Sequence, residues 1–138
     1  MVRIITLILC SGFLSSALAH SYHADKEKSV FFVTPSNNEI LTNPIKIGFG
    51  ATGVDIVPAG VDKPMSGHHH LLINVDKLPD MKSPIPADKN HLHFGAGQTE
   101  TEINLPKGKH TLQLLLGNHL HIPHADPVMS EKIEITVK

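Results

Sequence analysis

The segment HHHLLINV at residues 68–75 is the strongest strand candidate in the chain. From Leu71 onward an aliphatic side chain recurs at every second position, which is the spacing of side chains on one face of a β-strand. His69 shares this apolar face, whereas His68 and His70 share the opposite face. We therefore expect His69 to be buried or half-buried with a hydrogen bond to the backbone. His68 and His70 are expected either to take part in a metal site or polar network, or to lie on a solvated edge.

The rest of the chain continues this pattern in both directions. Short segments with alternating apolar residues are separated by clusters of Pro, Gly, Asn and Ser, which favour turns. This organisation predicts an all-β domain, an immunoglobulin-like antiparallel β-sandwich of about seven strands, with a small open barrel as the alternative. Its core would contain Ile, Leu and Val together with Phe49 and either Phe31 or Phe32. The expected strands are 29–34, 45–50, 68–75, 100–105, 108–116 and 130–138, with a short one within 76–99.

The N-terminal segment is predicted to be a signal peptide. Arg3 precedes an apolar run that is too short to span a bilayer, and the run ends in Ala-Leu-Ala, a pattern that signal peptidase accepts. Cleavage between Ala19 and His20 would release a protein without a membrane span into the periplasm or the medium. Cys10, the only cysteine, would be removed, which excludes thiolate zinc sites and cysteine nucleophiles. The expected organisation is a signal peptide at 1–19, a polar tail at 20–28 and one β-sandwich domain at 29–138.

Composition argues against a nucleic-acid partner and draws attention to histidine. The chain has 138 residues, with 12 Lys and Arg against 13 Asp and Glu. Its formal net charge of −1 provides no basic surplus of the kind that binding to phosphates requires. Histidine occurs 11 times, against one Tyr and no Trp. An account of function must therefore explain the histidines.

Three H-x-H patterns, at 68–70, 91–93 and 119–121, contain most of the histidines. Residues i and i+2 of a strand point to the same side, so each pattern can present two imidazoles together. In an immunoglobulin-like arrangement the segments with these patterns meet at one end of the sandwich, whereas His110 lies at the other end and is expected to be structural. Imidazole nitrogen suits copper and zinc. The candidate metal ligands are His68, His70, His93, His119, His121 and His124.

Several runs resemble a known family. They are GHHHLLI at 67–73, HFGAGQTE at 93–100, LPKGKHTLQL at 105–114, HIPH at 121–124 and PVMS at 127–130. Over residues 45–138 the chain is similar to a family of exported bacterial domains catalogued as domain of unknown function 4399. The resemblance implies a small, secreted, β-rich domain, and it implies no particular activity.

Three functions are compatible with these features. The first is a periplasmic or extracellular domain that binds copper or zinc, to which the amino group and ring of His20 could add ligands. The second is a cell-envelope interaction module that recognises a protein or a glycan through loops such as the Pro-rich segment 76–90. The third is a hydrolase that uses a metal-bound water near Asp126 and Glu131. No serine-centred nucleophile motif is visible, so the residues favour a binding protein over an enzyme.

Overall fold

The computed structural model describes residues 27–138, so the predicted signal peptide and most of the predicted tail, including His20, lie outside the described residues. Residues 27–138 contain nine β-strands, and no helix long and apolar enough to cross a membrane occurs among them. The predicted all-β class is confirmed. The strands are β1 (Ser29–Thr34), β2 (Glu39–Leu41), β3 (Ile45–Thr52), β4 (Asp55–Ile56), β5 (Ser66–Ile73), β6 (His91–His93), β7 (Glu100–Ile103), β8 (Gly108–Gly117) and β9 (Ile133–Val137).

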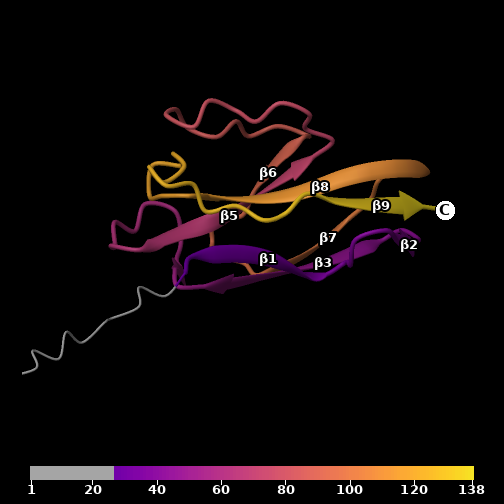
Figure 1. Ribbon diagram of the computed structural model, residues 1–138, viewed down its shortest axis with the longest axis horizontal. Coiled ribbons are helices and arrows are strands. Elements are labelled where there is room, and N and C mark those ends of the chain that lie inside the picture. Colours follow the sequence, from indigo (N-terminus) through magenta and orange to yellow (C-terminus); the bar gives the residue numbers. More distant parts are fainter. Residues whose placement is uncertain (1–26) are drawn as a thin grey trace, which may run out of the picture.

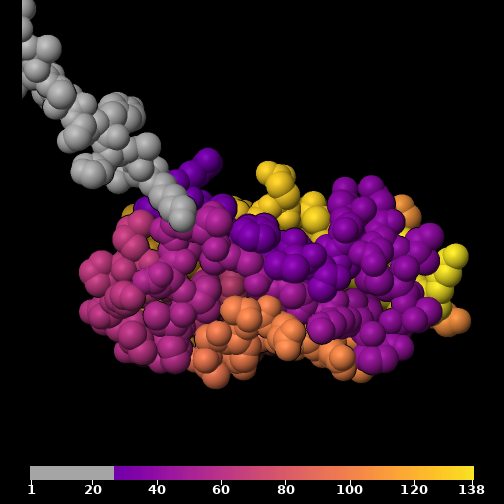
Figure 2. Space-filling model, turned by 90° about the horizontal axis from the view of Figure 1, so that it is seen from below, coloured from indigo at the N-terminus to yellow at the C-terminus, as the bar shows by residue number. Residues whose placement is uncertain are grey.

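The strands form two layers, as the sandwich prediction requires (Figure 1). One sheet has three strands in the order β1-β3-β7, and the other has the order β2-β9-β8-β5-β4, with β6 also paired to β5. In Figure 1 the three-stranded sheet is the lower layer, and β5, β8 and β9 lie above it. The outer surface of the lower layer carries residues from β1, β3 and the segment that follows β3, with the region of β7 in orange beside them (Figure 2).

The structure has two strands more than the sequence predicts. β2 and β4 contain three and two residues, too few for an alternating pattern to appear in the sequence. Each is held by parallel pairing, β2 with β9 and β4 with β5, whereas the remaining pairs are antiparallel. The sandwich is thus confirmed, while its immunoglobulin-like topology stays a prediction.

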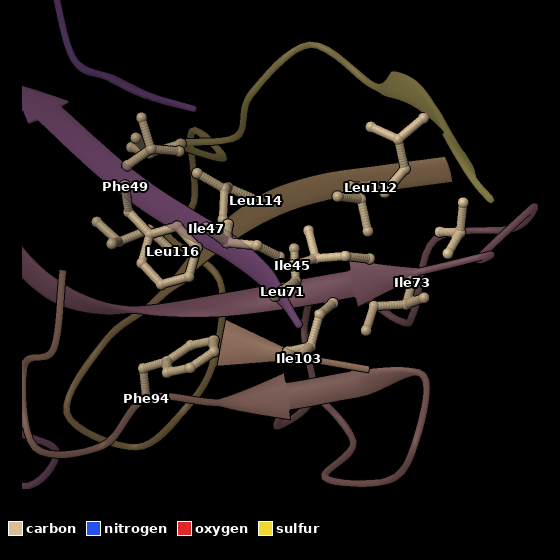
Figure 3. Packing of buried hydrophobic residues seen from close by; sticks show 14 residues of the cluster. Ile45, Ile47, Phe49, Leu71, Ile73, Phe94, Ile103, Leu112, Leu114 and Leu116 are labelled. Atoms are coloured by element: carbon tan, nitrogen blue, oxygen red, sulfur yellow. The ribbon is translucent and has the colours of Figure 1, made fainter. Parts of the chain in front are cut away.

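Aliphatic side chains from both sheets fill the space between the layers (Figure 3). Phe32 packs against this core, whereas Phe31 is 43% exposed, which decides between the two phenylalanines. Burial of each large side chain contributes about 1.5–3 kcal/mol to folding. The inward positions include Ile45, Ile47 and Phe49 on β3, Leu71 and Ile73 on β5, and Leu112, Leu114 and Leu116 on β8.

A second, smaller apolar cluster covers the outer face of the six-stranded sheet. Leu72 and Leu115 pack there with Val75 and Ile85 from the segment 74–90, which crosses above β5 in Figure 1. This cluster covers Leu72, and all eight residues of β5 are buried, on both faces of the strand. The face of β5 that carries His68 and His70 is therefore an interior surface rather than an open one.

Candidate metal centre

Strand β5 presents two imidazoles on its outer face. His68 and His70 leave the strand on the same side, and their exposed fractions are 0% and 1%. Their Nε2 atoms lie 3.2 Å apart. At this distance the two atoms can share one proton or bind the same metal ion.

The third imidazole comes from the neighbouring strand. β6 pairs with β5 so that His93 lies directly opposite His70. The ring centroid of His93 is 4.9 Å from that of His68 and 5.0 Å from that of His70. One nitrogen atom from each of the three residues lies within 4.8 Å of the other two. We call His68, His70 and His93 the three-histidine cluster.

A fourth imidazole, that of His121, packs against this cluster from a loop. Its ring centroid is 4.7 Å from that of His93 and 5.0 Å from that of His68. The residue has a φ of 65°, a left-handed conformation that is uncommon for a residue with a side chain. Its backbone N–H donates to the carbonyl of Asn118 at 2.8 Å, and its carbonyl accepts from the N–H of Ile85 at 2.9 Å. The surrounding structure therefore holds the backbone that carries the fourth ring.

Two glycines make room for these rings. A Cβ atom at Gly95 would overlap the imidazole of His93. Gly117 on β8 lies opposite His68, and a Cβ atom there would come within 2.8 Å of Nε2 of His70 and 3.3 Å of the carbonyl carbon of His121. Sequence reasoning missed Gly117. The available signal was a glycine within a strand pattern, which often marks the close approach of another group.

Burial keeps the cluster neutral. The pKa of His68 is lowered to about 4 and that of His70 to about 3, first by burial and then by the charge that the neighbouring imidazoles would carry. The pKa of His93 is also lowered, by burial and by His121. At neutral pH these rings therefore have free nitrogen lone pairs, which is the form that binds metal ions.

His69 points to the other side of β5, into the core. Its expected burial is confirmed, whereas the expected hydrogen bond to the backbone is wrong, as is a solvated edge for His68 and His70. The exposed fraction of His69 is 0%, and its ring centroid is 5.1 Å from that of Phe49. Neither ring nitrogen has a hydrogen-bond partner. Burial alone lowers the pKa of His69 to about 4. This side chain is a neutral, unpaired polar group among hydrocarbons, separated from the cluster by its own strand.

The other candidate ligands have different neighbours. Nδ1 of His119 lies 3.3 Å from a carboxylate oxygen of Asp62. His124 is half-buried, its Nε2 atom has no hydrogen-bond partner, and its pKa is lowered mainly by burial. Of the six candidate ligands, the structure brings together His68, His70, His93 and His121. The ring of His119 is paired with Asp62, and that of His124 makes no ring contact with the four.

His110 and His91 are paired with groups outside the cluster. The side-chain amide of Asn74 donates to Nδ1 of His110 at 2.9 Å, and Nε2 of His110 donates to the carbonyl of Pro106 at 2.8 Å. Both ring nitrogens of His110 are therefore satisfied, which fits the structural role expected for it. Nδ1 of His91 lies 2.9 Å from a carboxylate oxygen of Asp88. This pairing occupies the ring of His91, which precedes the cluster residue His93 by two positions on β6.

Comparison with known proteins places the chain in a family. Residues 47–138, about two thirds of the chain, match the family model described as "Domain of unknown function (DUF4399)". The matched range includes all four clustered imidazoles. No curated protein and no solved structure matches the chain. Because the match covers more than half of its length, the chain belongs to the DUF4399 family.

Proposed function

We propose that this protein binds one copper or zinc ion through the three-histidine cluster, with His121 beside the ion. The observation that carries the proposal is the convergence of three nitrogen donors, His68 and His70 from β5 and His93 from β6, within 4.8 Å of one another. We further propose that binding takes place in the periplasm or outside the cell, after removal of residues 1–19. The Ala-Leu-Ala sequence at the end of a short apolar run supports this location.

The spacing of the buried pair supports a tetrahedral ion. Bonds of about 2.0–2.1 Å from zinc to imidazole place two ligand nitrogens about 3.3 Å apart in a tetrahedral site. The Nε2 atoms of His68 and His70 are 3.2 Å apart before any adjustment. His93 is exposed and lies at the end of a three-residue strand, so its ring can approach the ion by side-chain rotation. The two buried donors would thus define the site and the exposed donor would complete it.

The chemistry of the donors supports a transition metal rather than calcium or magnesium. The three donors of the cluster are all imidazoles, which suit copper and zinc, whereas calcium and magnesium require oxygen ligands. Neutral rings bind such an ion without first losing a charge-bearing proton. Asp126 and Glu131, the residues considered for hydrolysis, are exposed, and no enzymatic activity is proposed.

The proposal is tested by calorimetric titration of tag-free protein with Cu(II) and Zn(II). Wild type should bind one ion, and the variant His68→Ala/His70→Ala should lose this binding because the two buried donors are gone. His119→Ala is the matched control. It removes a histidine from the same loop as His121, but the ring of His119 faces Asp62 and not the cluster. Saturation should also raise the melting temperature, because the unfolded chain lacks the assembled site.

Two outcomes would contradict the proposal. Equal affinity in wild type and in His68→Ala/His70→Ala would place the ion elsewhere. If wild type binds neither metal more tightly than about 10 μM, a free energy near −7 kcal/mol, the envelope interaction module becomes the better hypothesis.

A further inference from the structure

We infer that the metal ion in this site takes a small anion from solvent as an additional ligand, on the side where His93 and His121 lie. The inference rests on the proposed metal function and concerns what else the ion binds. A closed structural site would instead have all its positions filled by protein side chains.

The charge of the site favours an anionic ligand. The cluster and His121 are imidazoles, which carry no charge in the form that binds metal. Within residues 27–138 the ion pairs of histidine with carboxylate are those of His91 with Asp88 and His119 with Asp62, so no carboxylate is paired with the four clustered rings. A divalent ion there would keep its full charge beside two completely buried ligands. Burying charge without a counter-charge is costly, and a bound anion removes part of that cost.

Access to the ion is one-sided. His68 and His70 are 0% and 1% exposed, so the β5 side of the site is closed to solvent. His93 is exposed and His121 is half-buried, so solvent reaches the site from their side. Three protein ligands leave one position of a tetrahedral ion free, and this position would face that side.

His121 borders the free position and does not need to occupy it. The nitrogen atoms that group within 4.8 Å belong to His68, His70 and His93. The ring of His121 lies outside this group, and its backbone is held in place by its bonds to Asn118 and Ile85. We therefore assign His121 as a residue beside the bound anion and not as the fourth ligand of the ion.

Azide is the probe for this position, because its binding to Cu(II) produces a charge-transfer absorption band and changes the electron paramagnetic resonance spectrum. Tag-free protein is loaded with one equivalent of Cu(II) in chloride-free buffer and titrated with sodium azide. Protein loaded with Co(II), a spectroscopic substitute for zinc, is titrated in parallel. We expect saturable binding of one azide per ion in wild type, an unchanged affinity in His119→Ala, and equal or tighter binding in His121→Ala.

The outcomes separate this inference from the proposed function. If one metal ion binds and azide changes neither the Cu(II) nor the Co(II) spectrum, the proposed function survives and the inference is wrong. Azide binding in His121→Ala but not in wild type would assign the fourth position to His121 and overturn the inference in the same way. Failure to bind either metal would overturn both. Removal of the ion by azide, detected as metal separated from protein on gel filtration, would also overturn the inference.

Discussion

The two faces of β5 place identical side chains in different surroundings. On the inner face, the single imidazole of His69 lies against Phe49 in the main core with both nitrogens unpaired. On the outer face, the Nε2 atoms of His68 and His70 lie 3.2 Å apart, and the ring centroid of His93 lies 4.9 Å and 5.0 Å from their centroids. Both faces are fully buried, so solvent exposure does not distinguish them.

The difference shows that function here depends on convergence rather than on burial or residue type. A lone buried imidazole costs stability, because its polar atoms lose water and gain no partner. Several buried imidazoles bear the same cost, yet together they form a set of donors that a metal ion can satisfy. The buried imidazoles of the outer face thus lower folding stability but form a candidate metal site. The buried imidazole of the inner face lowers stability without forming a site.

The largest effect that tests this comparison is acid unfolding. The folded-state pKa values of His68 and His69 are about 4 and that of His70 is about 3, against 6.5 for a free imidazole. Between pH 6.5 and 4 the unfolded chain therefore binds more protons than the folded chain. The free energy of unfolding decreases as pH falls through this range, by on the order of 3 kcal/mol for His69, whose shift comes from burial alone, and further for the coupled pair His68 and His70. The decrease levels off below the folded-state pKa values.

Urea denaturation of the metal-free protein at several pH values measures this effect. Because total stability is only about 5–15 kcal/mol, we expect the domain to unfold before pH 4 is reached. His69→Leu should reduce the dependence of the unfolding free energy on pH by the contribution of one histidine. The contribution of His68 and His70 on the outer face should remain. A stability that does not change between pH 7 and pH 4.5 would show that the buried rings are not kept neutral.

The next effect compares a glycine that packs against the core, Gly67, with one that packs against the cluster, Gly117. A Cβ atom at Gly67 would lie 2.5 Å from the backbone oxygen of Gly117 and against core residue Leu116, so Gly67→Ala forces β5 and β8 apart. We expect a loss of about 2 kcal/mol in urea denaturation, the usual scale for overpacking a core. A Cβ atom at Gly117 instead meets Nε2 of His70 at 2.8 Å and the backbone carbon of His121 at 3.3 Å, so Gly117→Ala should weaken metal binding more than it weakens the fold. Equal losses of stability in the two variants would contradict this assignment.

The smallest effect is a gain. His69→Leu replaces an unpaired buried imidazole with an aliphatic side chain, and should raise the free energy of unfolding at pH 7 by about 1 kcal/mol. Affinity for Cu(II) and Zn(II) should not change, because the ring points away from the three-histidine cluster. Chemical denaturation and calorimetry of the same preparation check both parts. Weaker metal binding in this variant would mean that the inner ring supports the geometry of the outer pair.

Much of the fold followed from local pattern. The alternation from Leu71 onward assigned His69 to the core and His68 and His70 to the other face, and the structure agrees. The all-β class and the six longer strands could also be predicted from the sequence, because side-chain alternation and turn-forming residues act within a few residues of each other. The short strands β2 and β4 escaped prediction because pairing with distant segments, and not their own sequence, creates them.

The membership of the candidate site was decided by tertiary structure. The 119–121 pattern has the same spacing as the 68–70 pattern, yet His121 turns to the cluster through a left-handed backbone conformation while His119 turns to Asp62. His93 reaches His70 because of the register between β6 and β5. The sequence by itself determined the strand periods, the inward and outward faces of β5 and the supply of imidazoles, since these depend on local geometry. Only the tertiary structure determined which imidazoles meet and that the outer face is buried, because register, loop conformation and the cover provided by segment 74–90 depend on contacts between segments far apart in the chain.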